Sequence, residues 1–302
     1  MALDTRSSTA GRFAVTVDGT AVSFLKKFEG FNYEGDIVAN DMGPQLFQSK
    51  HMANFKYSPG KFTVGAGMGK GMWNWIKAAF EKGYVRKNGS IVSGDFDYNA
   101  RTEMSWQDGL ITSVTIPKFD ASAKDAIYLE VEVEAERVRI AKADGKITAQ
   151  YGTKQKAWLA PNFRLEIGGL PTDRVSTIDA MTWKCSIATD HTGIHREHAK
   201  VPAKVTVPEC KFTVSAADYG PWADAARKWF VDGAHLEGDH MQGRIVVLGP
   251  DMKTTMAALE LHNLGFKSFK SGAKEANSEK VDRLEIEMYM EGLTFSEYVA
   301  DA

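Results

Sequence analysis

The sequence is poor in cysteine and has no long apolar run. Its two cysteines, Cys185 and Cys210, are too few for a disulfide framework, so we expect buried thiols instead of a bridge. No apolar run approaches the length of about 18 residues that spans a membrane, and no apolar segment follows Met1 to Arg6. We therefore expect neither a spanning helix nor a secretory signal, and we expect synthesis in the cytoplasm.

An excess of positive charge is also missing. Lys and Arg number 37 against 39 Asp and Glu, a net charge of −2, and such a chain lacks the basic surface that tight nucleic-acid binding requires. The hydrophobic fraction of 43% and the charged fraction of 25% are typical of a soluble globular protein. At about 150 residues per domain, 302 residues correspond to two domains.

Catalytic and cofactor motifs are absent. The glycine-rich segment 65–71 resembles a phosphate-binding loop, but Val64 and Gly71 stand where that motif needs Gly and Ser or Thr. No nucleophile elbow, metalloprotease motif or dinucleotide fingerprint occurs. The alternating glutamates of 130–136 share one wet strand face, so their environments cannot separate their pKa values. We expect no enzyme activity and no cofactor.

A histidine cluster has the residue types of a zinc site but not its spacing. His191, His195 and His198 lie near the two cysteines, and imidazole and thiolate are donors that zinc prefers. The corresponding segment of the first half contains only His51 and no cysteine. We therefore expect no bound metal and interpret the cluster as part of a polar contact loop; elemental analysis would detect stoichiometric zinc.

An internal repeat organises the chain. Segments of the first half recur about 150 residues later, which predicts a tandem duplication of one module. We expect modules at 1–145 and 146–302, with a polar junction near 141–160. The matching segments are Phe13–Gly19 with Phe163–Gly169, Lys61–Val64 with Lys211–Val214, and, at an offset of 155, Leu129–Glu132 with Leu284–Glu287.

Most of each module alternates with period two, which predicts strands with one wet face. One segment per module has helical spacing: 73–80 in the first and 222–230 in the second, each followed by a glycine, Gly83 or Gly233, expected to cap it. Each module then contains two strands, a long loop, a strand, the helix and about three more strands. This order predicts a mainly β (α+β) fold of two small antiparallel β-barrel or sandwich modules, each with one flanking helix.

The pattern of Phe13 to Val38 with its Val-Asp-Gly turn, Lys61–Val64, Met72–Trp75 and Ile127–Val133 resembles the major tail tube proteins of contractile-tailed bacteriophages. It is also similar to tube proteins of contractile injection systems and type VI secretion. The resemblance implies a virion tail protein that polymerises as stacked rings around a lumen for phage DNA, assembled in the bacterial cytoplasm. The implied partners are other copies, the tail sheath, and baseplate and terminator proteins, with no membrane.

The resemblance also directs attention to two sets of residues. The first is a set of acidic side chains that would face the lumen and repel DNA phosphates: Glu130, Glu132, Glu285 and Glu287. The second lies in the loops 40–58 and 189–207, which would contact neighbouring subunits: Asp41, Gln45, Phe47, His51, His191, His195 and His198.

Several alternatives stay open at this point. A family member usually has one module, so this double chain could form a ring of three chains with pseudo-sixfold symmetry or a ring of six chains. A baseplate hub or tube initiator also uses paired tube-like domains. A monomeric ligand-binding β-barrel is the alternative outside the assembly class, and a contractile tail is not distinguished from a non-contractile one.

Overall fold

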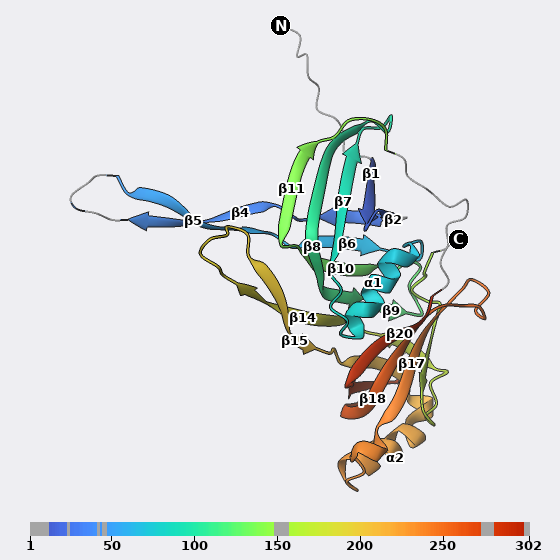
Figure 1. Ribbon diagram of the computed structural model, residues 1–302. Helices are drawn as coiled ribbons and strands as arrows, with labels where there is room; N and C mark the ends of the chain where they lie inside the picture. The colour runs from blue at the N-terminus through green and yellow to red at the C-terminus, as the bar shows by residue number, and fades with distance from the viewer. Residues whose placement is uncertain are drawn as a thin grey trace.

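The computed structural model describes residues 12–22, 25–40, 43, 47–147, 157–272 and 281–298. Two large antiparallel sheets, of 10 and 8 strands, and a separate two-stranded sheet make up most of the protein (Figure 1). The described residues include two α-helices, one in each half of the chain. The expected fold class, mainly β with one helix per module, is confirmed.

The first module contains the elements that precede residue 143. Its strands and helix are β1 (Arg12–Val17), β2 (Thr20–Val22), β3 (Leu25–Glu29), β4 (Tyr33–Asn40), β5 (Ser49–Tyr57), β6 (Gly60–Val64), α1 (Lys70–Phe80), β7 (Lys87–Gly94), β8 (Ala100–Ile116), β9 (Phe119–Asp120), β10 (Leu129–Glu134) and β11 (Arg137–Lys142).

The second module repeats most of this series, without described counterparts of β2 and β9 and with two short 3-10 helices, η1 and η2, added. Its elements are β12 (Phe163–Ile167), β13 (Val175–Ile178), β14 (Met181–Asp190), β15 (Ala199–Thr206), β16 (Cys210–Ser215), η1 (Ala216–Asp218), α2 (Tyr219–Phe230), η2 (Glu237–Asp239), β17 (Met241–Leu248), β18 (Thr255–Ser271), β19 (Arg283–Tyr289) and β20 (Gly292–Tyr298).

The two modules share one strand order. In the first it runs β1-β7-β8-β10-β6-β3, and in the second β12-β17-β18-β19-β16-β13. The last strand of each module, β11 or β20, pairs with the long strand β8 or β18. The repeat seen in the sequence is thus also a repeat of topology; the boundary at 145/146 stays a prediction, between the end of β11 and the start of β12.

Alternation sets the faces of the strands as expected. On β10, Val131 and Val133 are buried while the exposed Glu130 and the half-buried Glu132 point to the other face. A tight turn joins β1 to β2, where Asp18 and Gly19 both have positive φ, 47° and 75°. Two such residues give the turn whose twist matches a β-hairpin.

Both helices lie where their apolar spacing places them. Gly233 follows α2 with φ +78°, the left-handed conformation expected of a capping glycine. Gly83 also closes its helix, as expected, but Lys82 takes the positive φ (58°) and Gly83 does not. The Gly83 N–H instead bonds the Ala78 carbonyl oxygen at 2.7 Å, and a β-carbon there would lie 3.0 Å from that oxygen.

The segments predicted as long loops are β-hairpins, so that expectation was wrong. β4 pairs with β5, and β14 pairs with β15. Both hairpins extend away from the sheets on the same side of the molecule (Figure 1). β4 is exposed along its whole length, so no face of it is buried and the sequence carries no period-two hydrophobic signal.

Strand pairing also joins the two modules. β14 of the second module pairs with the end of β8, with Trp183 opposite Val114 and Thr182 opposite Thr115. Just beyond, β9 pairs with β13. Each of the two large sheets therefore contains strands from both modules.

The helix α1 covers the other part of this junction. Trp73 and Phe80 contact Phe295 of β20, with ring centroids 4.2 Å and 5.0 Å apart. Phe80 also contacts Trp183 edge to face at 5.5 Å, so one cluster of buried rings spans both modules. Within the described segments, neither helix has the length and apolar character needed to cross a bilayer.

Candidate functional site

One face of the 10-stranded sheet carries charged side chains. Around a groove of about 310 Å³ on this sheet lie three lysines and three glutamates: Lys27, Lys61, Lys184, Glu29, Glu130 and Glu132. Lys27 pairs with Glu29 at 2.7 Å and Lys61 with Glu132 at 3.9 Å. The charges on this face are balanced, so it offers phosphate groups little net attraction.

The second module repeats this arrangement on β19. Glu285 and Glu287 occupy the positions of Glu130 and Glu132 when β19 is matched to β10. Lys267 binds Glu287 at 3.2 Å and also donates to Glu209. The hydrogen bond from Lys267 lowers the pKa of Glu287 below its ordinary value. The structure thus places all four predicted glutamates on the polar sides of β10 and β19; that these faces line a lumen stays a prediction.

The first hairpin, β4–β5, contains the predicted contact residues of the first module. Phe47 is exposed near its tip, and His51 lies on β5 with a ring nitrogen 3.0 Å from the Ser49 hydroxyl. Asp41 and Gln45 lie outside the described residues. None of the described residues at this tip packs into the core.

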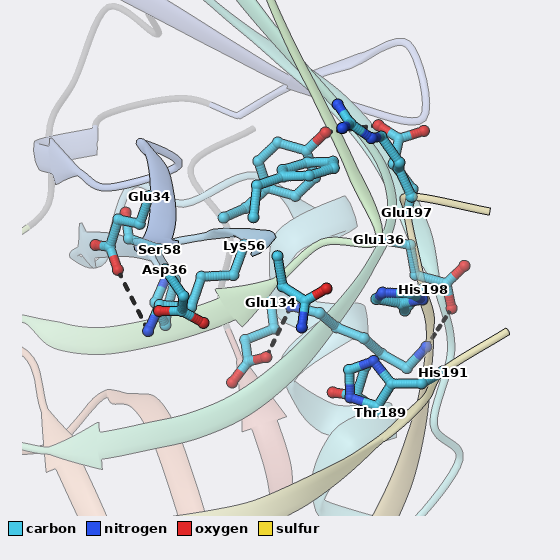
Figure 2. A pocket seen from close by; sticks show the side chains of 16 residues that line it. Glu34, Asp36, Lys56, Ser58, Glu134, Glu136, Thr189, His191, Glu197 and His198 are labelled. Atoms are coloured by element: carbon cyan, nitrogen blue, oxygen red, sulfur yellow. Dashed lines mark hydrogen bonds and ion pairs between the residues drawn. The ribbon is translucent and has the colours of Figure 1, made fainter. Parts of the chain in front are cut away.

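A cleft of about 590 Å³ separates the two hairpins (Figure 2). His191 and His198 of the second hairpin line it, with ring centroids 4.4 Å apart, and Glu34 and Lys56 line it from the first. His195 lies in a neighbouring hollow and not in this cleft. In the described part of the chain, no group of three His, Cys, Asp or Glu side chains is arranged to hold a metal ion.

Glu197 holds the second hairpin to the first module. Its carboxylate accepts hydrogen bonds from the Tyr57 hydroxyl at 2.5 Å and from the Arg139 guanidinium at 2.5 Å and 3.1 Å, and Arg137 lies 3.3 Å away. The hydrogen bonds from Arg139 lower the pKa of Glu197. Burial, followed by the hydrogen bond to Glu197, raises the pKa of Tyr57. Sequence reasoning missed Glu197, which stands between two histidines and belongs to no motif.

Lys200 makes a second link from the same hairpin. Its ammonium group donates to Glu134 at 2.8 Å, and its backbone N–H donates to Glu136 at 2.9 Å. Arg86 donates to the Lys200 carbonyl oxygen at 2.6 Å and pairs with Glu136 at 3.6 Å. The last two glutamates of the alternating stripe therefore bind the other module, which the sequence pattern alone did not indicate.

The two cysteines take no part in these contacts. Cys185 and Cys210 are free and buried, as expected, and they belong to the apolar core. Burial raises the pKa of the Cys210 thiol to about 12. What the site does chemically is to join modules by strand pairing and charged contacts.

Comparisons with known proteins agree with the sequence resemblance. Residues 9–139 match the family model described as T4-like virus tail tube protein gp19. No curated protein matches the chain. Solved structures with similarity include the following three, each covering less than half of this chain.

The first comes from the sheath-tube complex of the PVC extracellular contractile injection system in its extended state, with 19% identity, 45% of this chain and 93% of that chain covered, and a TM-score of 0.41. A chain of the anti-feeding prophage tube-terminating cap has 20% identity, 47% and 100% coverage and a TM-score of 0.41. Hcp1 from Flavobacterium johnsoniae has 11% identity, 44% and 94% coverage and a TM-score of 0.31.

Proposed function

Because residues 9–139 match the model of the T4-like virus tail tube protein gp19 family, we propose that this chain is a structural tail protein that assembles with copies of itself into stacked rings. The rings form the hollow tail tube of a virion, and phage DNA passes through it. The sheath surrounds the tube, and baseplate and terminator proteins bind its ends.

The observation that carries the proposal is the pairing of β14 with β8. It adds a strand of one module to the edge of the next module's sheet, so the modules stand side by side and not back to back. A sheet that grows from module to module loses its exposed edges only when it closes on itself. Repetition of this contact around an axis produces a closed ring.

The polar sheet face supplies a surface suited to passage. Lys61 and Lys267 each lie beside a glutamate, Glu132 or Glu287, so neither lysine presents an uncompensated charge. DNA phosphates passing such a face find no fixed cationic site, and the genome slides. The glutamates neutralise the charge of the neighbouring lysines, and they also repel the DNA phosphates directly.

The hairpin tips serve contacts between rings. Phe47 is a large apolar side chain exposed at the end of β4–β5, and an exposed aromatic residue of this kind is typical of a protein–protein contact. His51 lies on the same hairpin. His191, His195 and His198 surround the base of the second tip, where they complete the same contact surface.

Electron microscopy of the purified full-length chain over a range of concentrations tests this function. We expect rings or rods with a central channel, and symmetry determined from the particle images gives the number of modules per layer. A monomer at every concentration would contradict the proposal and favour a ligand-binding barrel instead. A single capped ring that never elongates would indicate a hub or initiator.

A further inference from the structure

Among the described residues, the strand addition that joins the modules occurs once, although each module contains both a strand like β14 and a strand edge like that of β8. β14 adds to β8, whereas the matching strand β4 pairs only with β5. Conversely, residues 265–271 of β18 pair with β19 on one side, and no described strand pairs with their other side. The chain therefore has one strand, β4, that adds to no larger sheet, and one sheet edge, residues 265–271 of β18, that no described strand covers.

Burial distinguishes the used strand from the unused one. Trp183 of β14 is 2% exposed, whereas Tyr33, the residue 150 positions earlier on β4, is 55% exposed. Ile37 and Val38 on β4 are also exposed, and such a run of apolar side chains on a two-stranded hairpin indicates a surface that is covered by a partner.

The helices show the same asymmetry on the opposite side. Phe295 of β20 is 6% exposed because α1 packs on it. The matching residue on β11 is Ile140, which is 47% exposed. The end of α2, in turn, presents Phe230, which is 51% exposed, and Val231. One module thus exposes an apolar strand residue, and the other exposes the helix end that would cover it.

We propose that a second copy of this chain occupies these surfaces: β4 of one chain adds antiparallel to β18 of the next, in the register that β14 uses on β8. This inference rests on the proposed function and names its interface. Matching β8 to β18 through their pairing with β10 and β19 places Tyr33 opposite Phe269 and Asn32 opposite Lys270 of the neighbour. Ile140 of the first chain then lies under the end of α2 of the neighbour.

A charged contact is repeated along with the strand pairing. Within the chain, Lys200 binds Glu134 and Glu136. The residue at the position of Lys200 on β5 is Lys50, opposite Ala39 as Lys200 is opposite Thr189. The residue at the position of Glu136, in the turn between the last two strands, is Glu291, and it is exposed. Lys50 of one chain therefore lies beside Glu291 of the next, and its backbone N–H donates to that carboxylate as the N–H of Lys200 donates to Glu136. Tyr289 stands at the position of Glu134, so the Lys50 ammonium has Glu291 as its carboxylate partner there.

Such a contact is head to tail, and it closes into a ring when the rotation allows. The interface within a chain and the interface between chains use equivalent strands and registers. A ring of six modules therefore contains three chains. Internal and external strand pairings then alternate around it, and no sheet edge of this kind stays free.

Cysteine cross-linking of the full-length chain tests the register. Asn32→Cys with Lys270→Cys is the test variant, and Thr115→Cys with Thr182→Cys is the matched control, because those two hydroxyls lie 3.1 Å apart within one chain. On oxidation we expect the test variant to give covalent dimers and trimers and nothing larger on a denaturing gel. The control should give only an internally linked monomer, and each single variant should give no cross-link.

Charge reversal gives a second readout that needs no disulfide. We expect Lys50→Glu or Glu291→Lys to raise the concentration needed for half-maximal assembly by about tenfold, and the double variant to restore it. Lys253→Glu, in the turn between β17 and β18, is the charge-matched control and should leave assembly unchanged.

The outcomes separate this inference from the function on which it rests. Rings that form without the cross-link, and without response to either charge reversal, would overturn the β4–β18 contact and leave the tube proposal standing. Covalent species larger than trimers would overturn the three-chain ring. A chain that stays monomeric in every experiment would overturn both proposals.

Discussion

Replacing Trp183 by Ala tests whether the module junction stabilises the chain itself. Trp183 is buried between β14, β8 and α1, and its ring contacts Phe80 at 5.5 Å. Removing a fully buried indole loses its burial free energy and leaves a cavity, a cost of about 4 kcal/mol in the free energy of unfolding. Tyr33→Ala is the corresponding substitution on the hairpin that adds to no other sheet. It removes an exposed ring and should lower the free energy of unfolding by about 1 kcal/mol or less.

Urea unfolding of both variants, at a concentration too low for assembly, measures this difference. We expect a large fall in the unfolding midpoint for Trp183→Ala and almost none for Tyr33→Ala. Assembly assays should show the opposite sensitivity, because Tyr33→Ala should fold normally and still fail to form rings. Equal destabilisation of the dilute chain by the two substitutions would refute the reasoning, since it would mean that both hairpins are docked in the single molecule.

Three further predictions concern other contacts. Because the folded-state pKa of Glu197 lies below the ordinary 4.5, Glu197→Gln should destabilise the chain near neutral pH, and acid titration of both proteins should show this difference vanishing as the pH falls through that depressed pKa. Gly30→Ala should lower the melting temperature strongly, because φ is +114° and a β-carbon would lie 2.0 Å from the Pro59 carbonyl oxygen; an unchanged melting temperature would contradict this. Cys210, buried with a pKa of about 12, should react with a thiol reagent only at the rate of unfolding, so rapid labelling of the native chain would show the burial to be wrong.

The sequence predicts those parts of the fold in which one face is wet and the other is buried. β1, β10 and both helices followed directly from hydrophobic periodicity, and the duplication followed from matching segments that recur 150 to 155 residues apart. The hairpin β4–β5 could not be found in this way, because β4 and most of β5 are exposed on both faces and the alternation is lost.

Strand pairing between modules left no pattern in the sequence. The opposition of Trp183 and Val114 depends on register, which the fold sets and no local motif records. All four glutamates of the segment 130–136 belong to one alternating pattern. Glu134 and Glu136 nevertheless bind Lys200, whereas Glu130 and Glu132 lie on the polar face beside Lys27 and Lys61. Which partner each glutamate meets is decided by the distant segment that docks there.

The internal β14–β8 pairing has a consequence for the rate at which the proposed ring nucleates. In the proposed three-chain ring, half of the module contacts would already exist when each polypeptide finishes folding, at an effective concentration that a mixture of separate modules could not reach. Nucleation then requires the meeting of three bodies and not six, so its rate should rise with roughly the third power of protein concentration at most. Two modules in one chain would in this way replace a slow six-body nucleation step with a faster three-body one.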